Sequence, residues 1–410
     1  MQRAGINTVR VYNLDPTIDH TQCMSIFNAA GIYMVLDVNS PLPGQSLDRS
    51  APYETYNGDY MQRVFQMVEA FKNFNNTLGF FSANEVINEQ SVPSVPQYIR
   101  AVTRDLKDYI AKHSSRTIPV GYSAADVRPL LMDTFNYLGC NLANSTSSKM
   151  DFFGLNSYSW CGDSNYQMSG YDILVSDFAG TTVPVFFSEY GCNQVMPRTF
   201  TEVQAIYSAP FDGVFSGGLV YEYSEEANNF GLVTINSDGS MSLSTDYVNL
   251  INQYNMINLK ALTAANSTAT GQTAPSCSSI VLTSNLTNSF DVPARLPEIQ
   301  TMIDSGVNGT YPSGFVKVNN TNQVATVKNP DGSTLTGLKL QVLANDQSNL
   351  PNGNTSGTSG TSTSGSSSST TTSTATGSST PKSTNIATSY QVNLGAIILA
   401  ALTFGLFVQL

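Results

Sequence analysis

Short apolar segments alternate with longer amphipathic segments along the first 223 residues of the chain. The short segments are rich in Val, Ile, Phe and Tyr, which is typical of buried strands, and the longer ones repeat apolar residues at helical spacing. Regular alternation of strand and helix predicts a parallel α/β fold. The predicted strands are 6–12, 32–38, 78–84, 118–123, 152–158, 183–189 and 218–223, and the predicted helices are 19–30, 58–74, 95–113, 127–133, 168–178, 199–209 and 244–255.

The strand bodies are apolar and their C-terminal ends are polar, so the polar groups gather at one end of the predicted sheet. A (β/α)8 TIM-type barrel presents its catalytic groups at that end. The barrel needs eight strands and the pattern supplies seven, with no room for another after residue 223, where the alternation ends. The polar groups at the strand ends are Arg10, Tyr12, Asn13, Asp37, Asn39, Asn84, Glu85, Tyr122, Asn156, Tyr158, Glu189, Tyr221 and Tyr223.

Two of these strands end in a carboxylate in matched contexts. The segment Leu78-Gly-Phe-Phe-Ser-Ala-Asn-Glu-Val86 delivers Asn84 and Glu85, and the segment Val183-Pro-Val-Phe-Phe-Ser-Glu-Tyr-Gly191 delivers Glu189. A pair of carboxylates that face one cavity is typical of the catalytic residues of a glycosidase. The alternative for either residue alone is a solvated or ion-paired acid at the end of an ordinary strand. The occurrence of two matched strands favours catalysis.

Charge and composition narrow the class of substrate. A formal net charge of −11 with only 19 Lys and Arg residues argues against a nucleic acid or an anionic membrane surface as partner. A neutral polysaccharide is compatible with this balance. The histidines, His20 and His113, have no metal-ligand or catalytic-triad spacing around them. We therefore expect an enzyme without metal or cofactor, in which carboxylates and tyrosines carry the chemistry.

The composition changes beyond the predicted barrel. Residues 263–350 are rich in Thr, Asn and Ser and contain alternating segments at 314–318 and 338–342, which predict a small β-rich module packed on the barrel. Residues 351–387 form a Ser/Thr/Gly-rich linker that cannot build a core. Residues 388–410 carry a polar spacer and an apolar tail, which is the pattern of a removable GPI-attachment signal. A short membrane span is the alternative.

Cysteines and glycosylation sequons fit a secreted chain. Seven N-x-S/T sequons begin at Asn75, Asn144, Asn266, Asn285, Asn308, Asn319 and Asn354. Five cysteines, which show no CxxC metal pattern, are Cys23, Cys140, Cys161, Cys192 and Cys277. With the C-terminal pattern, these features predict disulfides and a location on the outer face of the plasma membrane, and possibly in the cell wall. No signal peptide precedes the first predicted strand, and one cysteine is left over.

Four longer motifs occur in the chain in a distinctive order. They are Ile6-Asn-Thr-Val-Arg-Val-Tyr-Asn-Leu-Asp-Pro16, Thr77-Leu-Gly-Phe-Phe-Ser-Ala-Asn-Glu-Val86, Phe187-Ser-Glu-Tyr-Gly-Cys192, and Gly217-Gly-Leu-Val-Tyr-Glu-Tyr223 followed by Asn228-Asn-Phe-Gly231. The chain resembles, from residue 1 to about 350, the fungal β-1,3-glucanosyltransferases of glycoside hydrolase family 72. The resemblance implies a (β/α)8 barrel with a small C-terminal module and a GPI anchor. The cysteine-rich glucan-binding module of some members is not expected, because only Cys277 follows the barrel.

The resemblance also implies roles for individual residues. Glu85 matches the acid/base and Glu189 the nucleophile, while Asn84 matches the amide that holds the 2-hydroxyl of the sugar. Ser82-Ala83 precedes Asn84 where relatives commonly have Ala-Gly, a small departure that leaves the chemistry in place. The tyrosines that match residues lining the donor site or touching the nucleophile are Tyr12, Tyr158 and Tyr221.

The resemblance further implies a disulfide framework and a missing strand. The expected bridges are Cys161–Cys192 and Cys140–Cys277, which leave Cys23 to pair with a cysteine upstream of the first strand seen here. That first strand matches the second strand of the family. We therefore expect residues 1–262 to be an N-terminally truncated barrel and the sequence to be an incomplete gene model.

The activity implied by the resemblance is retaining glycosyl transfer. Glu189 would attack the anomeric carbon of a β-1,3-glucan while Glu85 protonates the leaving sugar, with the carboxyl groups ~5–5.5 Å apart. A second glucan chain would then accept the glycosyl group, so that a monomeric enzyme elongates cell-wall glucan. One alternative is a hydrolytic β-1,3-glucanase with the same carboxylates. A second alternative, from another class, is a non-catalytic anchored protein that only binds glucan.

Overall fold

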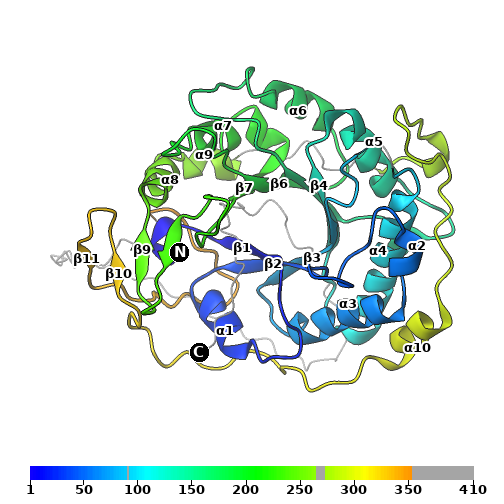
Figure 1. The fold of residues 1–410 in the computed structure, drawn as a ribbon, viewed down its shortest axis with the longest axis horizontal. Coiled ribbons are helices and arrows are strands. Elements are labelled where there is room, and N and C mark those ends of the chain that lie inside the picture. Colours follow the sequence, from blue (N-terminus) through cyan, green and yellow to red (C-terminus); the bar gives the residue numbers. More distant parts are fainter. Residues whose placement is uncertain (90–91, 265–272, 353–410) are drawn as a thin grey trace, which may run out of the picture.

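The computed structural model describes residues 1–89, 92–264 and 273–352, and a seven-stranded parallel sheet lies at its centre (Figure 1). The strands follow one another in sequence order around the sheet, which curves until β1 and β7 approach each other. The predicted fold class, a TIM-type barrel, is confirmed, and the described residues form seven parallel strands of it. The strands are β1 (Thr8–Val11), β2 (Tyr33–Asp37), β3 (Thr77–Asn84), β4 (Val120–Ala125), β5 (Phe152–Asn156), β6 (Val185–Tyr190) and β7 (Phe215–Val220).

Helices surround the sheet on its outer face (Figure 1). Helix α3 shows why they form: Asn57 caps its first turn by accepting the N–H of Tyr60 at 3.0 Å, and its apolar residues face the sheet. All seven predicted helices occur: α4 has the predicted ends, and each of the others is shifted at one end or both. They are α1 (Thr21–Ala29), α3 (Gly58–Phe71), α4 (Val95–His113), α5 (Arg128–Gly139), α6 (Tyr171–Phe178), α7 (Glu202–Ile206) and α8 (Thr245–Asn255).

Helix α7 is shorter at both ends than its prediction of 199–209. Phe200 has a φ of +53°, outside the right-handed helical region, so the helix cannot begin before that residue. Beyond Ile206 the chain turns through Pro210 into a short 3-10 turn at Phe211–Gly213. The periodicity of the sequence overestimates the length of this helix, because the spacing of apolar residues does not reveal where the backbone turns.

Residues 273–352 contain less strand than their alternating pattern predicts. Only β10 (Val327–Lys328) and β11 (Thr334–Leu335) form there, and they join the hairpin of β8 (Val233–Ile235) and β9 (Met241–Leu243) in a small second sheet. The predicted strand at 314–318 is irregular. The helix α10 (Pro297–Ser305), which the pattern did not predict, packs against α3 and α4.

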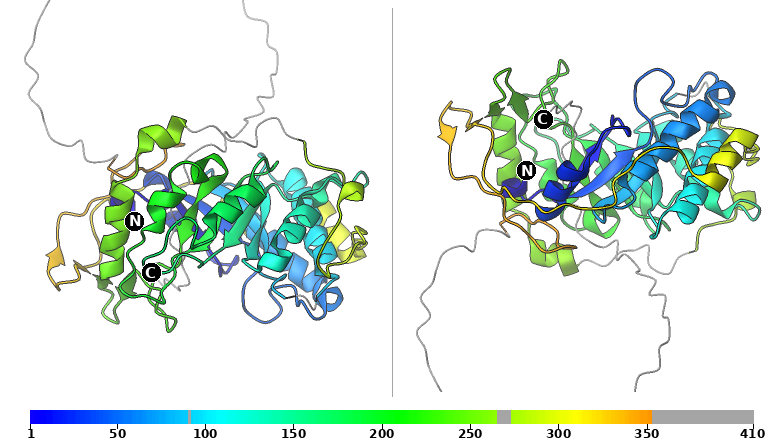
Figure 2. Two further views of the ribbon diagram at one scale, coloured as in Figure 1. Left: turned by 90° about the horizontal axis from the view of Figure 1, so that it is seen from above. Right: turned by 90° about the horizontal axis from the view of Figure 1, so that it is seen from below.

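The same segment runs along the outside of the barrel and is attached at many points (Figure 2). The disulfide Cys140–Cys277 holds its start to the end of α5, as the family resemblance predicted. Near its end, the fully buried Asn349 donates to the main-chain oxygens of Gln2 (2.7 Å) and Ile6 (2.9 Å). Residues 273–352 therefore cover the barrel, which argues that both parts fold together.

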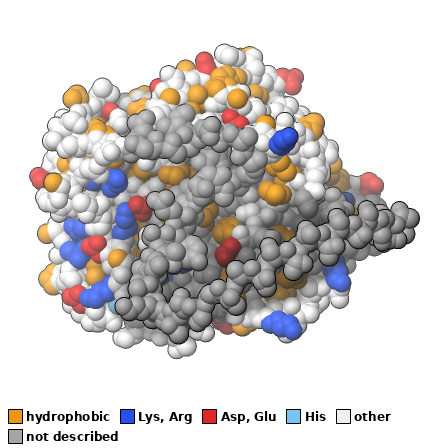
Figure 3. Space-filling model, turned by 180° about the vertical axis from the view of Figure 1, so that it is seen from behind, with side chains coloured by type: hydrophobic (Ala, Val, Ile, Leu, Met, Phe, Trp, Pro, Cys, Tyr) orange, Lys and Arg blue, Asp and Glu red, His pale blue; other side chains and the backbone are white. Residues whose placement is uncertain are grey.

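Charged residues on the outer helices are largely paired. Seen from behind, Lys and Arg side chains gather mainly along one edge with acidic side chains among them (Figure 3). On α4, Lys107 pairs with Asp151 at 2.6 Å and Lys112 pairs with Asp304 at 2.7 Å. Among the residues that the structure describes, no helix is both long enough and apolar enough to cross a bilayer. The predicted Ser/Thr-rich linker and GPI-attachment signal, from residue 353 onward, lie outside the described residues.

Candidate active site

Glu189 lies near the C-terminal end of β6, a strand in which every residue is buried. Its side chain is held by three donors: Tyr12 Oη at 2.7 Å and Arg10 Nη1 at 3.3 Å to Oε1, and Tyr158 Oη at 2.7 Å to Oε2. Burial raises the pKa of Glu189 above its ordinary value; Arg10 and the two phenols act in the opposite direction, because they favour the ionised carboxylate, but they only partly offset the effect of burial. The carboxyl group of Glu189 is therefore shielded from solvent and fixed in position by its neighbours.

Glu85 follows the last residue of β3 and has a φ of +50°, which is unusual for a residue other than glycine. Its N–H donates to the oxygen of Ser123 on β4 at 2.8 Å, which continues the sheet past the end of the strand. Asn156 Nδ2 donates to Glu85 Oε1 at 2.8 Å. Because strained backbone gathers at functional sites and persists only where neighbours hold it, the conformation of Glu85 supports an active role.

Arg10 on β1 connects the two carboxylate-bearing strands. Its guanidinium is fully buried and donates to Asp37 Oδ2 and to Asn84 Oδ1, both at 2.9 Å, in addition to Glu189. Burial lowers the pKa of Arg10, but the negative charges of Asp37 and Glu189 outweigh it and raise the pKa overall. The site therefore contains a permanent cation between two acids.

Asn156 at the end of β5 is the second connector, and it lies opposite Glu189 in the register of β5 and β6. Its oxygen accepts from Ser188 Oγ at 2.7 Å and from Ser123 Oγ at 3.1 Å. Its nitrogen donates to Asn84 and Glu85. A single buried amide thus orients the side chains at the ends of β3 and β6.

Aromatic rings form a wall beside Glu189, which we call the aromatic wall and define as Tyr158, Tyr221 and Phe230. The ring of Phe230 lies 5.5 Å from that of Tyr158 and 5.1 Å from that of Tyr221, both in edge-to-face geometry. Tyr12 meets Tyr221 at 6.2 Å. Rings of this kind pack against the apolar faces of sugars while their hydroxyl groups bind sugar hydroxyls.

All six residues assigned from the sequence lie in this one region. Tyr12, Tyr158 and Glu189 share hydrogen bonds, and Glu85 and Asn84 are joined to them through Asn156 and Arg10. Tyr221 contacts the group through its ring and accepts from Asn228 Nδ2 at 3.1 Å. The catalytic roles of Glu85 and Glu189 stay predictions.

Sequence reasoning noticed Arg10 and Asn156 as polar strand ends but gave them no role. Their partners lie up to 179 residues away in the chain, so no local signal could have identified the contacts. Phe230 and Arg198 were not assigned at all. For Phe230 a signal existed, because it belongs to the motif Asn228-Asn-Phe-Gly231 that carried the family resemblance.

The predicted disulfide Cys161–Cys192 is present and joins the loops that follow β5 and β6 on the active-site face. Cys23 is exposed and unpaired within the described residues. In the same part of the chain, no group of three or more His, Cys, Asp or Glu side chains is arranged to hold a metal ion. The side chains that contact Glu85 and Glu189 are an amide, phenols and a guanidinium.

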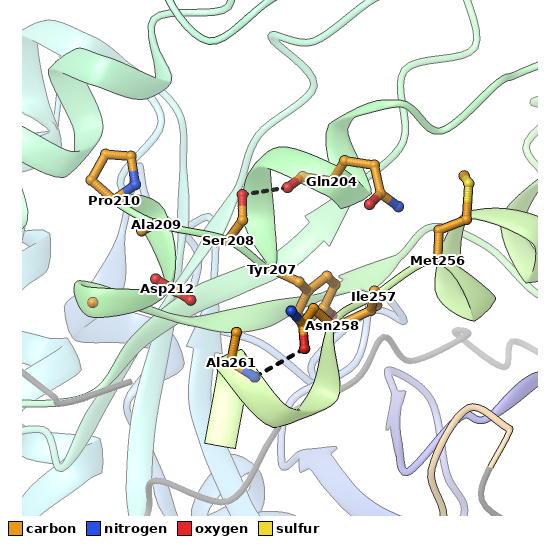
Figure 4. A pocket seen from close by; sticks show the side chains of 11 residues that line it. Gln204, Tyr207, Ser208, Ala209, Pro210, Asp212, Met256, Ile257, Asn258 and Ala261 are labelled. Carbon is orange, nitrogen blue, oxygen red and sulfur yellow. Dashed lines mark hydrogen bonds between the residues drawn. The ribbon is translucent and has the colours of Figure 1, made fainter. Parts of the chain in front are cut away.

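A hollow of about 680 Å³ lies away from this chemistry (Figure 4). It borders the 3-10 turn Phe211–Gly213, which precedes β7 and so lies at the N-terminal end of the barrel strands. Its lining residues are Gln204, Tyr207, Ser208, Ala209, Pro210, Asp212, Gly213, Met256, Ile257, Asn258 and Ala261. In this fold the N-terminal end serves stability, so the hollow is not assigned to catalysis.

A parallel barrel with two carboxylates at its C-terminal strand ends defines a glycosidase-type enzyme. Residues 1–258 match the family model described as Glucanosyltransferase, and the chain belongs to that family, glycoside hydrolase family 72. It is similar to 1,3-β-glucanosyltransferase gel2 of Aspergillus fumigatus, with 55% identity over 360 residues that cover 88% of this chain and 75% of gel2.

Two Saccharomyces cerevisiae proteins extend the comparison. The probable 1,3-β-glucanosyltransferase GAS3 is 49% identical over 323 residues, covering 75% of this chain and 61% of GAS3. The structure of a Glu-to-Gln mutant of Gas2 with laminaritetraose and laminaripentaose has a TM-score of 0.59 and 39% identity, covering 63% of this chain and 57% of that one. This chain thus aligns with less than two thirds of the length of these two relatives.

Proposed function

We propose that this chain is a retaining β-1,3-glucanosyltransferase, which cleaves a β-1,3-glucan and transfers the new reducing end to a second glucan chain. The observation that carries the proposal is the arrangement of Glu189, which is buried and held by two phenols and Arg10 beside Glu85. Membership in the glucanosyltransferase family and the laminari-oligosaccharides bound to Gas2 support glucan as the substrate.

The first half of the reaction uses both carboxylates. Glu189 attacks the anomeric carbon and forms a covalent glycosyl-enzyme, while protonated Glu85 gives its proton to the oxygen of the departing sugar. The donors on Glu189 favour its ionised form and hold it in position before the attack, so little reorganisation is needed in the transition state. Asn156, which donates to Glu85, fixes the direction of the acid.

Transfer completes the cycle. Glu85, now ionised, removes the proton from the 3-hydroxyl of an acceptor glucan, whose oxygen attacks the anomeric carbon and releases Glu189. Asn84 holds the reacting sugar: its oxygen already accepts from Arg10 and Asn156, so its amide nitrogen is the group that donates to the 2-hydroxyl. A water molecule in place of the acceptor would give hydrolysis with the same residues.

The product lengths separate transfer from hydrolysis. Incubation with a laminari-oligosaccharide whose reducing end has been chemically reduced should yield products longer than the substrate, detected by mass spectrometry. Products that are exclusively shorter would show a hydrolase. Binding of the oligosaccharide without turnover would favour the non-catalytic alternative. Glu189→Gln serves as the control that should make neither longer nor shorter products.

We also propose that the enzyme acts as a monomer tethered by a lipid anchor to the outer face of the plasma membrane. The Ser/Thr-rich residues 351–387 and the apolar end of residues 388–410 support this location. Treatment of intact cells with a phosphatidylinositol-specific phospholipase C should release the protein. Retention after that treatment and extraction only by detergent would indicate a membrane-spanning tail instead.

A further inference from the structure

Arg198 is a buried arginine that takes no part in the chemistry described above. It lies in the loop between β6 and α7 and is 3% exposed. Its Nε donates to Asp246 Oδ2 of α8 at 2.6 Å, and its main-chain N–H donates to Asp246 Oδ1 at 3.0 Å. Both charges are therefore buried and compensated, which costs desolvation that a purely apolar contact would avoid.

The other side-chain hydrogen bonds of Arg198 go to main-chain oxygens on the active-site face. They join Gly191 at 3.3 Å and Tyr221 at 2.7 Å to Nη1, and Phe230 at 2.5 Å to Nη2. Gly191 lies two residues after Glu189, and Tyr221 and Phe230 belong to the aromatic wall. One guanidinium thus connects three segments that meet at the nucleophile.

The side chain also packs against rings. The guanidinium carbon of Arg198 lies 4.8 Å from the centre of Phe200 and 5.7 Å from that of Phe230. Asn249 on α8 donates to the main-chain oxygen of Arg198 at 2.7 Å, which fixes the loop from the other side. The position of Arg198 is consequently determined by α8, and Arg198 in turn determines where Tyr221 and Phe230 lie.

We propose that Arg198, held by Asp246, is a positioning residue that sets the aromatic wall for the glucan chain. The inference rests on the proposed glucan substrate. Arg198 does not touch the reacting atoms; it acts through Tyr221 and Phe230, whose rings contact Tyr158 beside Glu189. Displacing Tyr221 and Phe230 should weaken binding of the sugar chain more than it slows the chemical step, because the side chains that donate to Glu189 belong to other residues.

Arg198→Lys tests the proposal because an ammonium group has only three donors on one nitrogen and cannot reach Asp246 and three separated oxygens together. We expect KM for a laminari-oligosaccharide to rise at least about tenfold, with kcat lowered less than about threefold. The acid limb of the pH profile should not move. Asp246→Asn, which keeps the shape of the partner, should change KM in the same direction by a smaller factor.

Arg100→Lys is the matched control. Arg100 on α4 is also fully buried and also donates to main-chain oxygens, those of Tyr137 (2.6 Å) and Cys140 (3.2 Å), but these lie away from the site. This variant should lower the melting temperature without changing KM. If Arg198→Lys behaves like Arg100→Lys, then Arg198 has only a structural role and the proposal is overturned.

A double-mutant cycle that combines Arg198→Lys with Phe230→Ala tests whether Arg198 changes KM through the aromatic wall. If Arg198 acts through the wall, the two changes in KM should be less than additive, since Phe230→Ala already removes part of the wall. Full additivity, or a fall in kcat with a shifted acid limb, would place the action of Arg198 elsewhere and overturn the proposal.

Binding measurements distinguish this inference from the proposed function. Elongation of the oligosaccharide by the wild-type protein establishes transfer whatever Arg198 does. If the wild type binds without turnover, the proposed function fails. The Arg198 proposal is then decided by calorimetry, where Arg198→Lys should weaken oligosaccharide binding at least about tenfold and an unchanged Kd would refute it.

Discussion

The ends of β6 and β3 each carry a glutamate, yet their surroundings differ. Glu189 on β6 is buried, 8% exposed, and receives two phenols and a guanidinium. Glu85 after β3 is more accessible, receives an amide from Asn156, and has a backbone in the left-handed region. The two residues are similar in sequence context and unlike in environment.

The difference corresponds to two chemical tasks. A nucleophile must be ionised before each attack, and charge-assisted hydrogen bonds stabilise that form. An acid/base must bind and lose a proton in each cycle. Several hydrogen-bond donors around it would oppose protonation, because they stabilise the ionised form. The three donors around Glu189 therefore fit a nucleophile, and the more open surroundings of Glu85, with its single amide donor, fit an acid/base.

The largest expected effect comes from removing either carboxylate. Glu189→Gln should lower kcat by at least about 10³-fold on every substrate, because no other group can form the covalent bond. Glu85→Gln should lose activity on glucan but retain cleavage of an aryl glycoside with an acidic phenol as leaving group, since that bond needs no proton. Steady-state rates on the two substrates measure the contrast.

The control for this experiment is Glu298→Gln on the exposed side of α10, which should leave both rates unchanged. If the activated substrate instead rescues Glu189→Gln and not Glu85→Gln, the two roles are reversed. If the activated substrate rescues neither variant, the different environments of Glu85 and Glu189 do not correspond to different catalytic roles.

Removing Arg10 should lower the stability of the fold, because Arg10 connects the ends of β3 and β6. Arg10→Met leaves the buried Asp37 without its partner, which typically costs about 3–5 kcal/mol in the free energy of unfolding. Chemical denaturation measures the loss. The double variant Arg10→Met/Asp37→Leu should recover much of the stability without recovering activity. A single variant as stable as the wild type would mean that the pair does not organise the site.

Tyr158→Phe should have a smaller effect that is confined to Glu189. A hydrogen bond to a charged group is worth about 1.5–3 kcal/mol, so kcat should fall roughly 10- to 100-fold. Loss of this donor should raise the pKa of Glu189 further above its ordinary value, so the nucleophile protonates at higher pH and the acid limb of activity moves upward.

The pH dependence of kcat checks this shift against a matched phenol. Tyr109 is buried and donates to Glu69 Oε1 at 2.9 Å, away from the site. Tyr109→Phe should alter stability and leave the acid limb in place. An unchanged acid limb in Tyr158→Phe would show that the phenol does not tune the nucleophile.

The smallest predicted effect concerns Glu202, a buried acid on α7, the helix that follows β6. Burial raises the pKa of Glu202 on α7 to about 7. Its folded pKa lies above its unfolded one, so its contribution to stability is complete below the unfolded pKa and disappears as pH rises through about 7. This amounts to about 1 kcal/mol between about pH 6 and 8. Thermal melts of Glu202→Gln should show a weaker decline over that range than the wild type.

Local patterns account for the barrel and for the two carboxylates. Strand bodies such as β3 and β6 are apolar segments that end in polar groups, so their type, their order and their functional ends follow from residues that are neighbours in the chain. The family resemblance added the two disulfides. It also assigned the three tyrosines, whose contacts with Glu189 or its neighbours the structure contains.

Long-range contacts account for what the pattern missed. Asn156 meets Glu85, and Arg10 meets Glu189, because sheet register and curvature bring together residues 71 and 179 positions apart. Arg198 is similar, because its contacts with Asp246, Tyr221 and Phe230 form only where α8 and the loops of the active-site face come together. Residues 273–352 follow the surface of the barrel because apolar side chains such as the half-buried Phe315, which lies against Phe74, pack on the barrel core. Local spacing cannot encode such contacts, because their free energy arises only when the closed fold supplies the partner.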